Sequence, residues 1–369
     1  MTPPDLTPPD VTPPDLAAAA GTVGDWVAAR LPAQVAHLDA AAAGRPSVAA
    51  LQAEVRHLHA EAARGGYVAE AEAAPVLDAG RAALGALVGL DGVAFSDGAG
   101  SAFATLVQSW PLPPGARVGT VPSEYGANAM VLRRLAGLRG WTLVPLPVDR
   151  LGRVSEVPAC DLVTFPHVAS QRGVVQPVGQ VLASGVPLLL DVAQSLGQTP
   201  VPPGCAAYVG TSRKWLCGPR GVAFLAVDPA WLPQLTTPPT LTPYDDLRRF
   251  DTQEAHVAGR VGLAVAAQEW TPDVLPVVHA RAAYARQVLA GTPWQVVEPV
   301  DEPTGITTLS GGDPLAARTA LLERGLLVSA VPASRSADLD GAVLRVSTAA
   351  WTQEHELDAL AAALRELTP

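Results

Sequence analysis

The chain contains a single lysine, Lys214, although it contains twenty-four arginines. An arginine guanidinium stays protonated in proteins, whereas a lysine amine loses its proton when it is desolvated or lies beside another cation. Lys214 follows an apolar stretch, stands beside Arg213 and precedes a Gly-Pro-Arg-Gly turn. This setting predicts a neutral, nucleophilic amine, which forms a Schiff base with a carbonyl compound. The alternative is a surface lysine without a role, for which a polar, exposed stretch is expected.

A carboxylate ends the apolar run VPLLLD, which is typical of a buried strand. A buried carboxylate needs a cationic partner, and the protonated pyridine nitrogen of pyridoxal phosphate is such a partner. Asp191 is therefore the candidate for the ring nitrogen, and Gln194 for the ring's phenolic oxygen. The alternative for Asp191 is the N-cap of a helix after the strand. Together, Asp191 and Lys214 at the ends of consecutive expected strands favour pyridoxal phosphate as the cofactor.

The stretch FSDGAGSAFATLV predicts a strand, a glycine turn and the start of a helix. Backbone N–H groups at a helix N-terminus bind phosphate, so Gly100 and Ser101 are candidate phosphate-binding residues. A G-x-G turn alone is often only a tight turn. Tyr125, in SEYGAN after the next expected strand, offers a flat ring to the cofactor, or is an ordinary core tyrosine.

Short apolar runs alternate with helical stretches between about residues 75 and 227. This alternation predicts a parallel α/β sheet covered by helices on both faces, with ligands at the carboxyl ends of the strands. The expected strands lie at residues 92–96, 116–122, 141–148, 160–166, 186–192, 206–212 and 221–227.

Four parts are expected along the chain. Residues 1–15 repeat a T-P-P-D unit and predict an extended tail, because proline fixes φ and removes backbone donors. Residues 16–47 are expected to pack with a smaller domain. Residues 48–250 would form the large cofactor-binding domain, and residues 251–369 the smaller α+β domain. The last helix, with Thr352 as its expected N-cap, closes the chain.

Composition argues against several function classes. The net charge is -10 and no run of arginines exceeds two, which argues against a nucleic-acid or anionic-membrane surface. The three cysteines, Cys160, Cys205 and Cys217, form no C-x-x-C pair, so we expect neither a disulfide framework nor a zinc site. The sequence shows no secretory signal and no apolar run of about 18 residues, which favours a cytoplasmic protein.

The order of these motifs resembles the class V aminotransferase group of fold-type I pyridoxal-phosphate enzymes. The matching motifs are the phosphate turn, E-aromatic-x-A-N, H-V-x-x, D-x-A-Q, the lysine and R-x-S, and they extend from residue 37 to residue 360. The resemblance implies a mostly parallel seven-stranded sheet covered by helices, with a smaller α+β domain. It also implies a homodimer whose sites lie at the subunit interface.

The resemblance also implies roles for individual residues. Lys214 would carry the cofactor and later move the α-proton of the substrate, while Asp191 and Gln194 hold the ring. Arg345, in R-x-S, matches the clamp for the substrate α-carboxylate, for which bidentate geometry suits arginine; the alternative is an ion pair on a strand surface. The other residues at cofactor-binding positions are Gly100, Ser101, Tyr125, Ser170, Thr211 and Arg213.

Several stretches look closer to the carbon–sulfur lyases of ergothioneine biosynthesis, among them PSEYGAN, ASQRGVVQP and SRKWLCGPRG. That branch implies β-elimination from hercynylcysteine sulfoxide, which yields pyruvate, ammonia and a sulfenate that is then reduced to ergothioneine. The substrate carries a quaternary ammonium group, which favours aromatic walls. Tyr67 and Tyr125 are the candidates for those walls, and simple packing is the alternative for Tyr67.

Two departures from the group bear on the chemistry. Desulfurases need a thiol on the loop before R-x-S, but residues 325–341 contain no cysteine and Cys217 is expected to pack in the core, which disfavours a persulfide mechanism. Where the group has Gly-Thr from the neighbouring subunit at the phosphate, this chain has Gln253 and Glu254. The open alternatives are a cysteine desulfurase, a simple cysteine-sulfoxide lyase, an isopenicillin-N epimerase, or a non-catalytic scaffold that binds the cofactor.

Overall fold

The computed structural model describes residues 22–236 and 244–367, so the T-P-P-D repeat lies outside the described residues. A seven-stranded sheet occupies the centre of the larger unit, and its strand order is β2-β10-β9-β8-β5-β3-β4. Only β10 runs antiparallel to its neighbours. The strands are β2 (Ala94–Ser96), β3 (Arg117–Thr120), β4 (Thr142–Pro145), β5 (Leu162–Pro166), β8 (Leu188–Asp191), β9 (Ala207–Thr211) and β10 (Ala223–Val227). The expectation of a mostly parallel seven-stranded sheet is confirmed.

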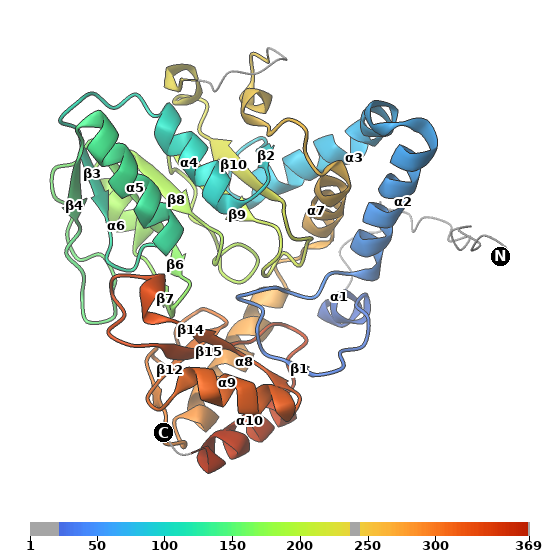
Figure 1. Ribbon diagram of the computed structural model, residues 1–369, viewed down its shortest axis with the longest axis vertical. Coiled ribbons are helices and arrows are strands. Elements are labelled where there is room, and N and C mark those ends of the chain that lie inside the picture. Colours follow the sequence, from blue (N-terminus) through green and yellow to red (C-terminus); the bar gives the residue numbers. More distant parts are fainter. Residues whose placement is uncertain (1–21, 237–243, 368–369) are drawn as a thin grey trace.

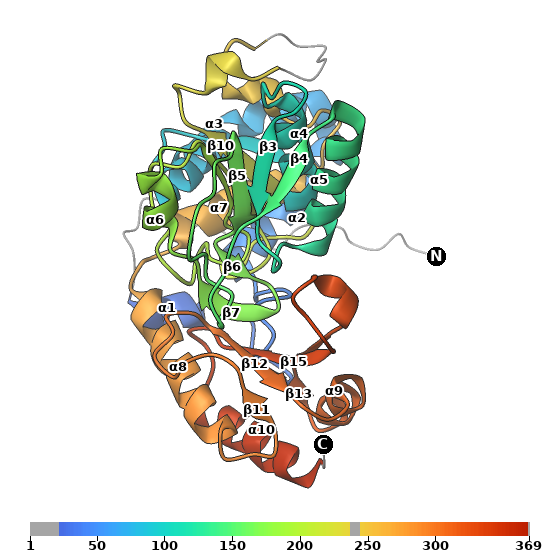
Figure 2. The same cartoon turned by 90° about the vertical axis from the view of Figure 1, so that its left-hand side faces the viewer.

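Helices cover both faces of this sheet, as Figures 1 and 2 show. Successive side chains of a strand point to opposite faces, so each central strand contributes to two cores. Leu188 and Leu190 of β8 belong to the core between the sheet and helices α2, α3, α6 and α7. Leu189 belongs to the core between the opposite face of the sheet and helices α4 and α5. The helices are α2 (Val48–Arg64), α3 (Gly66–Leu87), α4 (Ala99–Ser109), α5 (Gly126–Arg139), α6 (Val178–Ala183) and α7 (Val257–Glu269).

The smaller unit is a four-stranded antiparallel sheet of order β11-β12-β15-β14 with helices packed against it. Its leucine-rich core holds Leu344 and Val346 of β15 against Leu357 and Leu360 of the last helix. The elements are α8 (Val274–Leu289), β11 (Gln295–Val296), β12 (Ile306–Ser310), α9 (Pro314–Glu323), β13 (Leu326–Leu327), β14 (Ser329–Val331), β15 (Val343–Ser347) and α10 (Glu354–Glu366).

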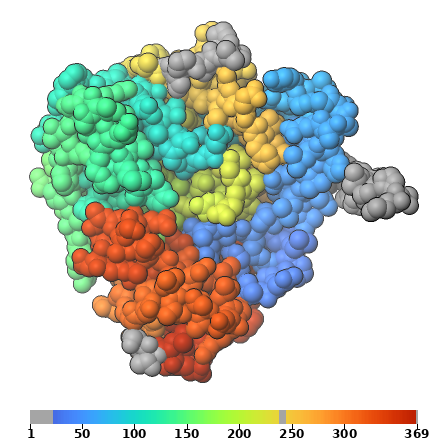
Figure 3. All heavy atoms as spheres, in the orientation of Figure 1, coloured from blue at the N-terminus to red at the C-terminus, as the bar shows by residue number. Residues whose placement is uncertain are grey.

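The segment before α2 joins the smaller unit. Strand β1 (Ala36–His37) pairs in parallel with β13, and Asp39 forms a bridge to Ser347 of β15. In the space-filling view the blue N-terminal segment lies beside the orange and red smaller unit (Figure 3). This agrees with the expected packing of the N-terminal segment, as far as residues 22–47 describe it.

The structure corrects two expectations from the sequence and adds elements that the sequence did not predict. Helix α7 was assigned to the smaller domain, but Val261 and Leu263 pack in the core with α2 and α3, so the boundary expected at residue 250 places α7 in the wrong unit. The N-cap of α10 is Gln353 in a capping box with Glu356, because the hydroxyl of Thr352 accepts from the Ala349 N–H instead. The short helix α1 (Val23–Ala28) and the hairpin of β6 (Val168–Ala169) and β7 (Arg172–Val175) were not expected.

No helix among the described residues is long and apolar enough to cross a membrane. Cys160, Cys205 and Cys217 are all free thiols, and no group of three or more His, Cys, Asp or Glu side chains in the described part of the chain could hold a metal ion.

Candidate active site

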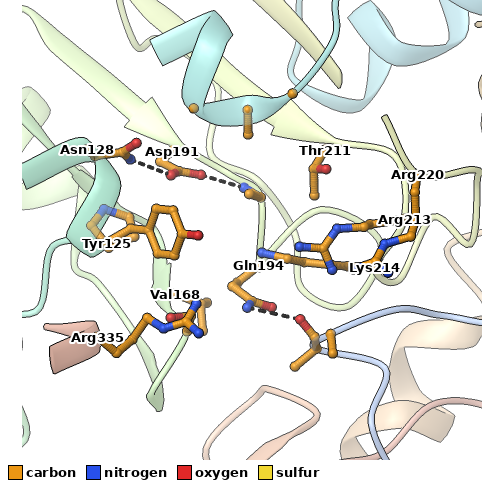
Figure 4. A pocket seen from close by; sticks show the side chains of 18 of the residues that line it. Tyr125, Asn128, Val168, Asp191, Gln194, Thr211, Arg213, Lys214, Arg220 and Arg335 are labelled. Carbon is orange, nitrogen blue, oxygen red and sulfur yellow. Dashed lines mark hydrogen bonds between the residues drawn. The ribbon is translucent and has the colours of Figure 1, made fainter. Parts of the chain in front are cut away.

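A cavity of about 390 Å³ lies where the carboxyl ends of β2, β5, β8 and β9 face the smaller unit. Its walls come from stretches far apart in the sequence: the segment after β1, the N-termini of α4 and α5, the ends of β5 and β8 with the residues that follow them, the loop after β9, the stretch from β14 to the turn at residues 333–335, and β15. Parallel sheets place ligand sites at this edge, because loops of different strands converge there. Figure 4 shows the labelled side chains pointing into this space.

Lys214 lines the cavity on the loop that follows β9. The segment after β1 lies against this loop, because Gly44 donates to the Arg213 carbonyl at 2.7 Å. A Cβ at position 44 would come within 2.1 Å of the Lys214 carbonyl oxygen, so only glycine fits there. Burial lowers the pKa of Lys214 to about 7, because it withdraws the charged amine from water. The charge of Arg213 lowers this pKa further, while the attraction of Asp191 raises it and offsets part of the shift. A large fraction of this amine is therefore neutral near pH 7.

Asp191 is the last residue of β8, and its carboxylate is buried. One oxygen accepts from Asn128 Nδ2 at 2.9 Å, and the other accepts from the Ala193 N–H at 2.8 Å. The following residues form turns rather than a helix, so Asp191 is not a helix N-cap. Burial raises the pKa of Asp191, and the charge of Lys214 only partly offsets that cost. A further cation beside Asp191 would stabilise the ionised form.

Two groups at the sides of the cavity have unused hydrogen-bonding capacity. Gln194 donates to the Ala41 carbonyl at 3.3 Å, and its side-chain oxygen is buried with no partner among the described residues. At the other side, Gly98 is the N-cap of α4, and Gly98, Ala99 and Gly100 line the cavity with their backbone. Thr211, Arg213 and Arg220 lie opposite that helix N-terminus (Figure 4).

Arg345 reaches the cavity from the middle of β15. Its guanidinium donates to the Ser170 carbonyl at 2.8 Å and pairs with Asp39 at 3.3 Å, while Nε has no partner in the described part of the chain. The ion pair considered for Arg345 therefore exists, but it is buried beside the cavity and not on the surface. Ser170 lines the cavity, and its hydroxyl donates to the Gln171 side chain at 3.2 Å.

Comparison with known proteins supports the assignment of the fold and identifies the family. The sequence model of the class V aminotransferases matches residues 37–260. The chain belongs to the class V aminotransferase family. It is 40% identical, over 92% of both chains, to a probable hercynylcysteine sulfoxide lyase from Mycobacterium tuberculosis.

Solved structures with the same fold include a cysteine desulfurase and a cystine C–S lyase. The apo cysteine desulfurase of Thermococcus onnurineus NA1 superposes with a TM-score of 0.84 at 16% identity, covering 95% of this chain and 99% of that one. A cystine C–S lyase in complex with cysteine persulfide gives a TM-score of 0.80 at 19% identity, covering 91% of this chain and 99% of that one. At these identities the likeness shows the fold.

Pyridoxal phosphate is the cofactor of this class V enzyme. The residues around the cavity fit this cofactor. A lysine amine with a lowered pKa suits its aldehyde, a buried carboxylate suits its ring nitrogen, and a helix N-terminus with two arginines suits its phosphate. The unpartnered oxygen of Gln194 marks a buried polar position that the cofactor would occupy. The expectation of a pyridoxal-phosphate-dependent carbon–sulfur lyase agrees with these comparisons.

The structure does not bring every candidate into the cavity of this class V enzyme. Ser101 is exposed in the first turn of α4 and does not line the cavity. The helix begins at Ala99, so the residues at its N-terminus that line the cavity are Gly98, Ala99 and Gly100. Tyr67 is 83% exposed at the start of α3. It lines a separate surface depression together with Gln253 and Glu254. Of the two candidate aromatic walls, only Tyr125 lines the cavity of the same chain.

Four polar residues near the cavity were not anticipated: Glu124, Asn128, Arg220 and Arg335. Glu124 and Asn128 are four residues apart at the start of α5, and Asn128 bridges Glu124 (3.2 Å) to Asp191 (2.9 Å). The spacing in S-E-Y-G-A-N was visible in the sequence, but the partner of Asn128 across the sheet was not. Arg335 lies in a loop that was considered only for its missing cysteine.

Glu124 is expected to make the cofactor-free protein less stable at alkaline pH. Burial and the neighbouring charge of Asp191 raise the pKa of Glu124 from 4.5 to about 8. Between these values the unfolded chain ionises while the folded carboxyl stays protonated, so this group lowers the free energy of unfolding as the pH rises. Glu124→Gln keeps the acceptor oxygen and removes the ionisation. Its melting temperature relative to the unaltered protein should rise by about 2 °C or more between pH 5 and pH 9.

Thermal denaturation at both pH values measures this difference. Glu156→Gln, at an exposed carboxyl, is the matched control and should show no such trend. A Glu124→Gln protein whose relative stability is the same at both pH values would show that Glu124 is ionised in the fold.

Proposed function

We propose that the protein is a β-eliminating carbon–sulfur lyase whose substrate is hercynylcysteine sulfoxide. The observation that carries this proposal is the 40% identity, over 92% of both chains, to the probable hercynylcysteine sulfoxide lyase. The cavity supports elimination over desulfuration, because none of the residues that line it is a cysteine. Cys217 is buried near Arg30, and burial raises the pKa of its thiol, so it is a poor sulfur acceptor.

In this proposal the chain's own groups bind the substrate and move one proton. Arg345 would hold the substrate α-carboxylate, using the free Nε and the guanidinium face that Asp39 and Ser170 keep in place. Lys214 Nζ, neutral near pH 7, would accept the α-proton. Pyridoxal phosphate, when bound, supplies an aldehyde for the amine and a conjugated ring that accepts the electron pair of the broken Cα–H bond.

Asp191 would keep that ring protonated, and Asn128 would keep the Asp191 carboxylate oriented. Thr211, Arg213 and the backbone at Gly100 would bind the phosphate, and Tyr125 would flank the ring. The Cβ–S bond then breaks, and its electron pair leaves with sulfur as a sulfenate. The released 2-aminoacrylate takes up water and gives pyruvate and ammonia. Conversion of the sulfenate to ergothioneine needs a separate reductant.

The further expectations about the assembly remain proposals. The protein would act in the cytoplasm as a homodimer, on a small cysteine S-conjugate. The depression lined by Tyr67, Gln253 and Glu254 would then lie at or near the partner subunit. The runner-up functions are the other class V reactions, of which epimerisation has a specific basis: the chain is 28% identical to the isopenicillin N epimerase of Amycolatopsis lactamdurans over 70% of its length.

Product analysis separates these functions. The purified holoenzyme is incubated with hercynylcysteine sulfoxide and a thiol reductant, and the products are measured by mass spectrometry. Elimination predicts ergothioneine with one equivalent each of pyruvate and ammonia. Alanine with a sulfur-loaded protein would indicate desulfuration, and inverted substrate alone would indicate epimerisation; either result would overturn the proposal.

A further inference from the structure

Arg335 places a positive charge in the cavity without a carboxylate to balance it. It lines the cavity from the turn after β14, and no acidic side chain in the described ranges 22–236 and 244–367 lies within salt-bridge distance of its guanidinium. The guanidinium carbon lies 5.6 Å from the centre of the Tyr125 ring. Its charge contributes to the lowered pKa of both Lys214 and Arg345, so it acts inside this cavity. An unbalanced cation in a confined site indicates an anionic ligand.

The other arginines of the cavity are already matched to the cofactor phosphate or to the substrate α-carboxylate. Arg213 and Arg220 lie together on the Thr211 side, where the phosphate would bind, while Arg335 lies on the opposite side next to Tyr125 (Figure 4). Arg345 is fixed by Asp39 and the Ser170 carbonyl. Neither the cofactor phosphate nor the α-carboxylate therefore accounts for Arg335.

The turn that carries Arg335 is held firmly in place. The hydroxyl of Ser336 donates to Asp338 at 2.6 Å and also lies 3.0 Å from the Pro122 carbonyl oxygen, so its one proton is shared between these two acceptors. Asp338 in turn accepts from Gln171 at 2.9 Å. The backbone of Gly126 is so close that a Cβ there would come within 2.8 Å of the Arg335 carbonyl oxygen. A cation carried by a well-ordered backbone loses little conformational entropy when it binds a ligand, and such preorganisation is typical of residues that determine specificity.

We propose that Arg335 binds a second carboxylate of the substrate, on the group attached to sulfur. This inference rests on the proposed function and adds a substrate class: cysteine S-conjugates with a carboxylate on the leaving group. The guanidinium and the Tyr125 ring lie side by side. They would offer a donor for a carboxylate and a π-face for a neighbouring quaternary ammonium, which are the two charges of a betaine.

The test compares two substrates that differ in one charge. S-(2-carboxyethyl)cysteine sulfoxide carries the second carboxylate, and S-propylcysteine sulfoxide does not. In the Arg335→Gln holoenzyme, KM for the carboxylate substrate should rise about tenfold or more, since a charge-assisted hydrogen bond is lost. KM for the propyl substrate and kcat for both should stay within about twofold. Arg335→Lys should restore part of the preference, because it keeps the charge but not the planar fork.

A binding measurement gives a second readout that needs no turnover. The amine-free dicarboxylate 3-(2-carboxyethylthio)propanoate is titrated into the holoenzyme in a calorimeter. Its dissociation constant should rise about tenfold in Arg335→Gln and stay unchanged in Arg134→Gln, an exposed arginine on α5 that serves as the matched control.

The outcomes separate this inference from the proposed function. If hercynylcysteine sulfoxide yields no pyruvate with the unaltered enzyme, the lyase assignment fails, and calorimetry still tests Arg335. If pyruvate forms but Arg335→Gln weakens both substrates equally, or neither, Arg335 has no role in recognising a second carboxylate. Loss of the dicarboxylate's affinity in Arg134→Gln as well would overturn the inference too, because the effect would then follow net charge.

Discussion

Replacing Lys214 with arginine is expected to lower turnover at least about 1,000-fold, the upper part of the range for losing a positioned base. Arginine keeps the positive charge and much of the length, so the fold should be retained. Its guanidinium, however, does not give up a proton and cannot bond to the cofactor aldehyde. The lysine amine would do both near neutral pH, because burial lowers the pKa of Lys214 to about 7.

Pyruvate release from a cysteine sulfoxide measures the loss of turnover. The matched control is Arg134→Lys, which adds a lysine at an exposed position on α5 and should leave the rate unchanged. Circular dichroism and the melting temperature establish that both variants fold. A Lys214→Arg enzyme that keeps more than a tenth of the rate would remove the amine from the reaction.

The second large effect is expected for Asp191→Asn, which should lower turnover about 100-fold or more and weaken cofactor binding. The buried carboxylate is the group that would hold the ring nitrogen in its protonated state, and an amide of the same shape carries no charge for it. The new NH₂ group would also face the amide of Asn128, which now donates at 2.9 Å. Breaking a buried charge pair typically costs 3–5 kcal/mol, which corresponds to at least about 100-fold.

Two measurements follow the Asp191→Asn variant: the rate of pyruvate release, and the dissociation constant of pyridoxal phosphate from absorbance after equilibrium dialysis. Asp273→Asn, at an exposed aspartate before α8, is the control and should match the unaltered enzyme in both. Equal rates and equal affinity in Asp191→Asn would mean that the ring nitrogen does not depend on this carboxylate.

The sequence predicted the large sheet well, and the two residues proposed as the centre of the site, Lys214 and Asp191, line one cavity. Runs such as VPLLLD are apolar at every position, which in a parallel sheet means burial on both faces, so their strands were found. Lys214 and Asp191 stand at the ends of such runs, and the topology of parallel strands alone places them at one edge. Helix α7 follows residue 250 yet packs on the larger unit, because the sequence pattern of a helix does not say which unit it packs on.

Residues whose positions depend on long-range packing were not predictable in the same way. Tyr67 is a candidate because of its residue type, but it lies in the first turn of α3 and is exposed there. Arg335 comes from the distant smaller unit, and its meeting with Tyr125 follows only from contacts such as the one between Ser336 and Pro122. The bond from Asn128 to Asp191 likewise joins residues 63 positions apart.

Reductive trapping tests the central claim most directly, namely that the one lysine of this chain carries the cofactor. The holoenzyme is treated with sodium borohydride, digested, and examined by peptide mass spectrometry. We expect a pyridoxyl adduct on the peptide that contains Lys214, and none in the Lys214→Arg protein. A holoenzyme that turns over its substrate yet yields an unmodified Lys214 peptide after reduction would contradict it.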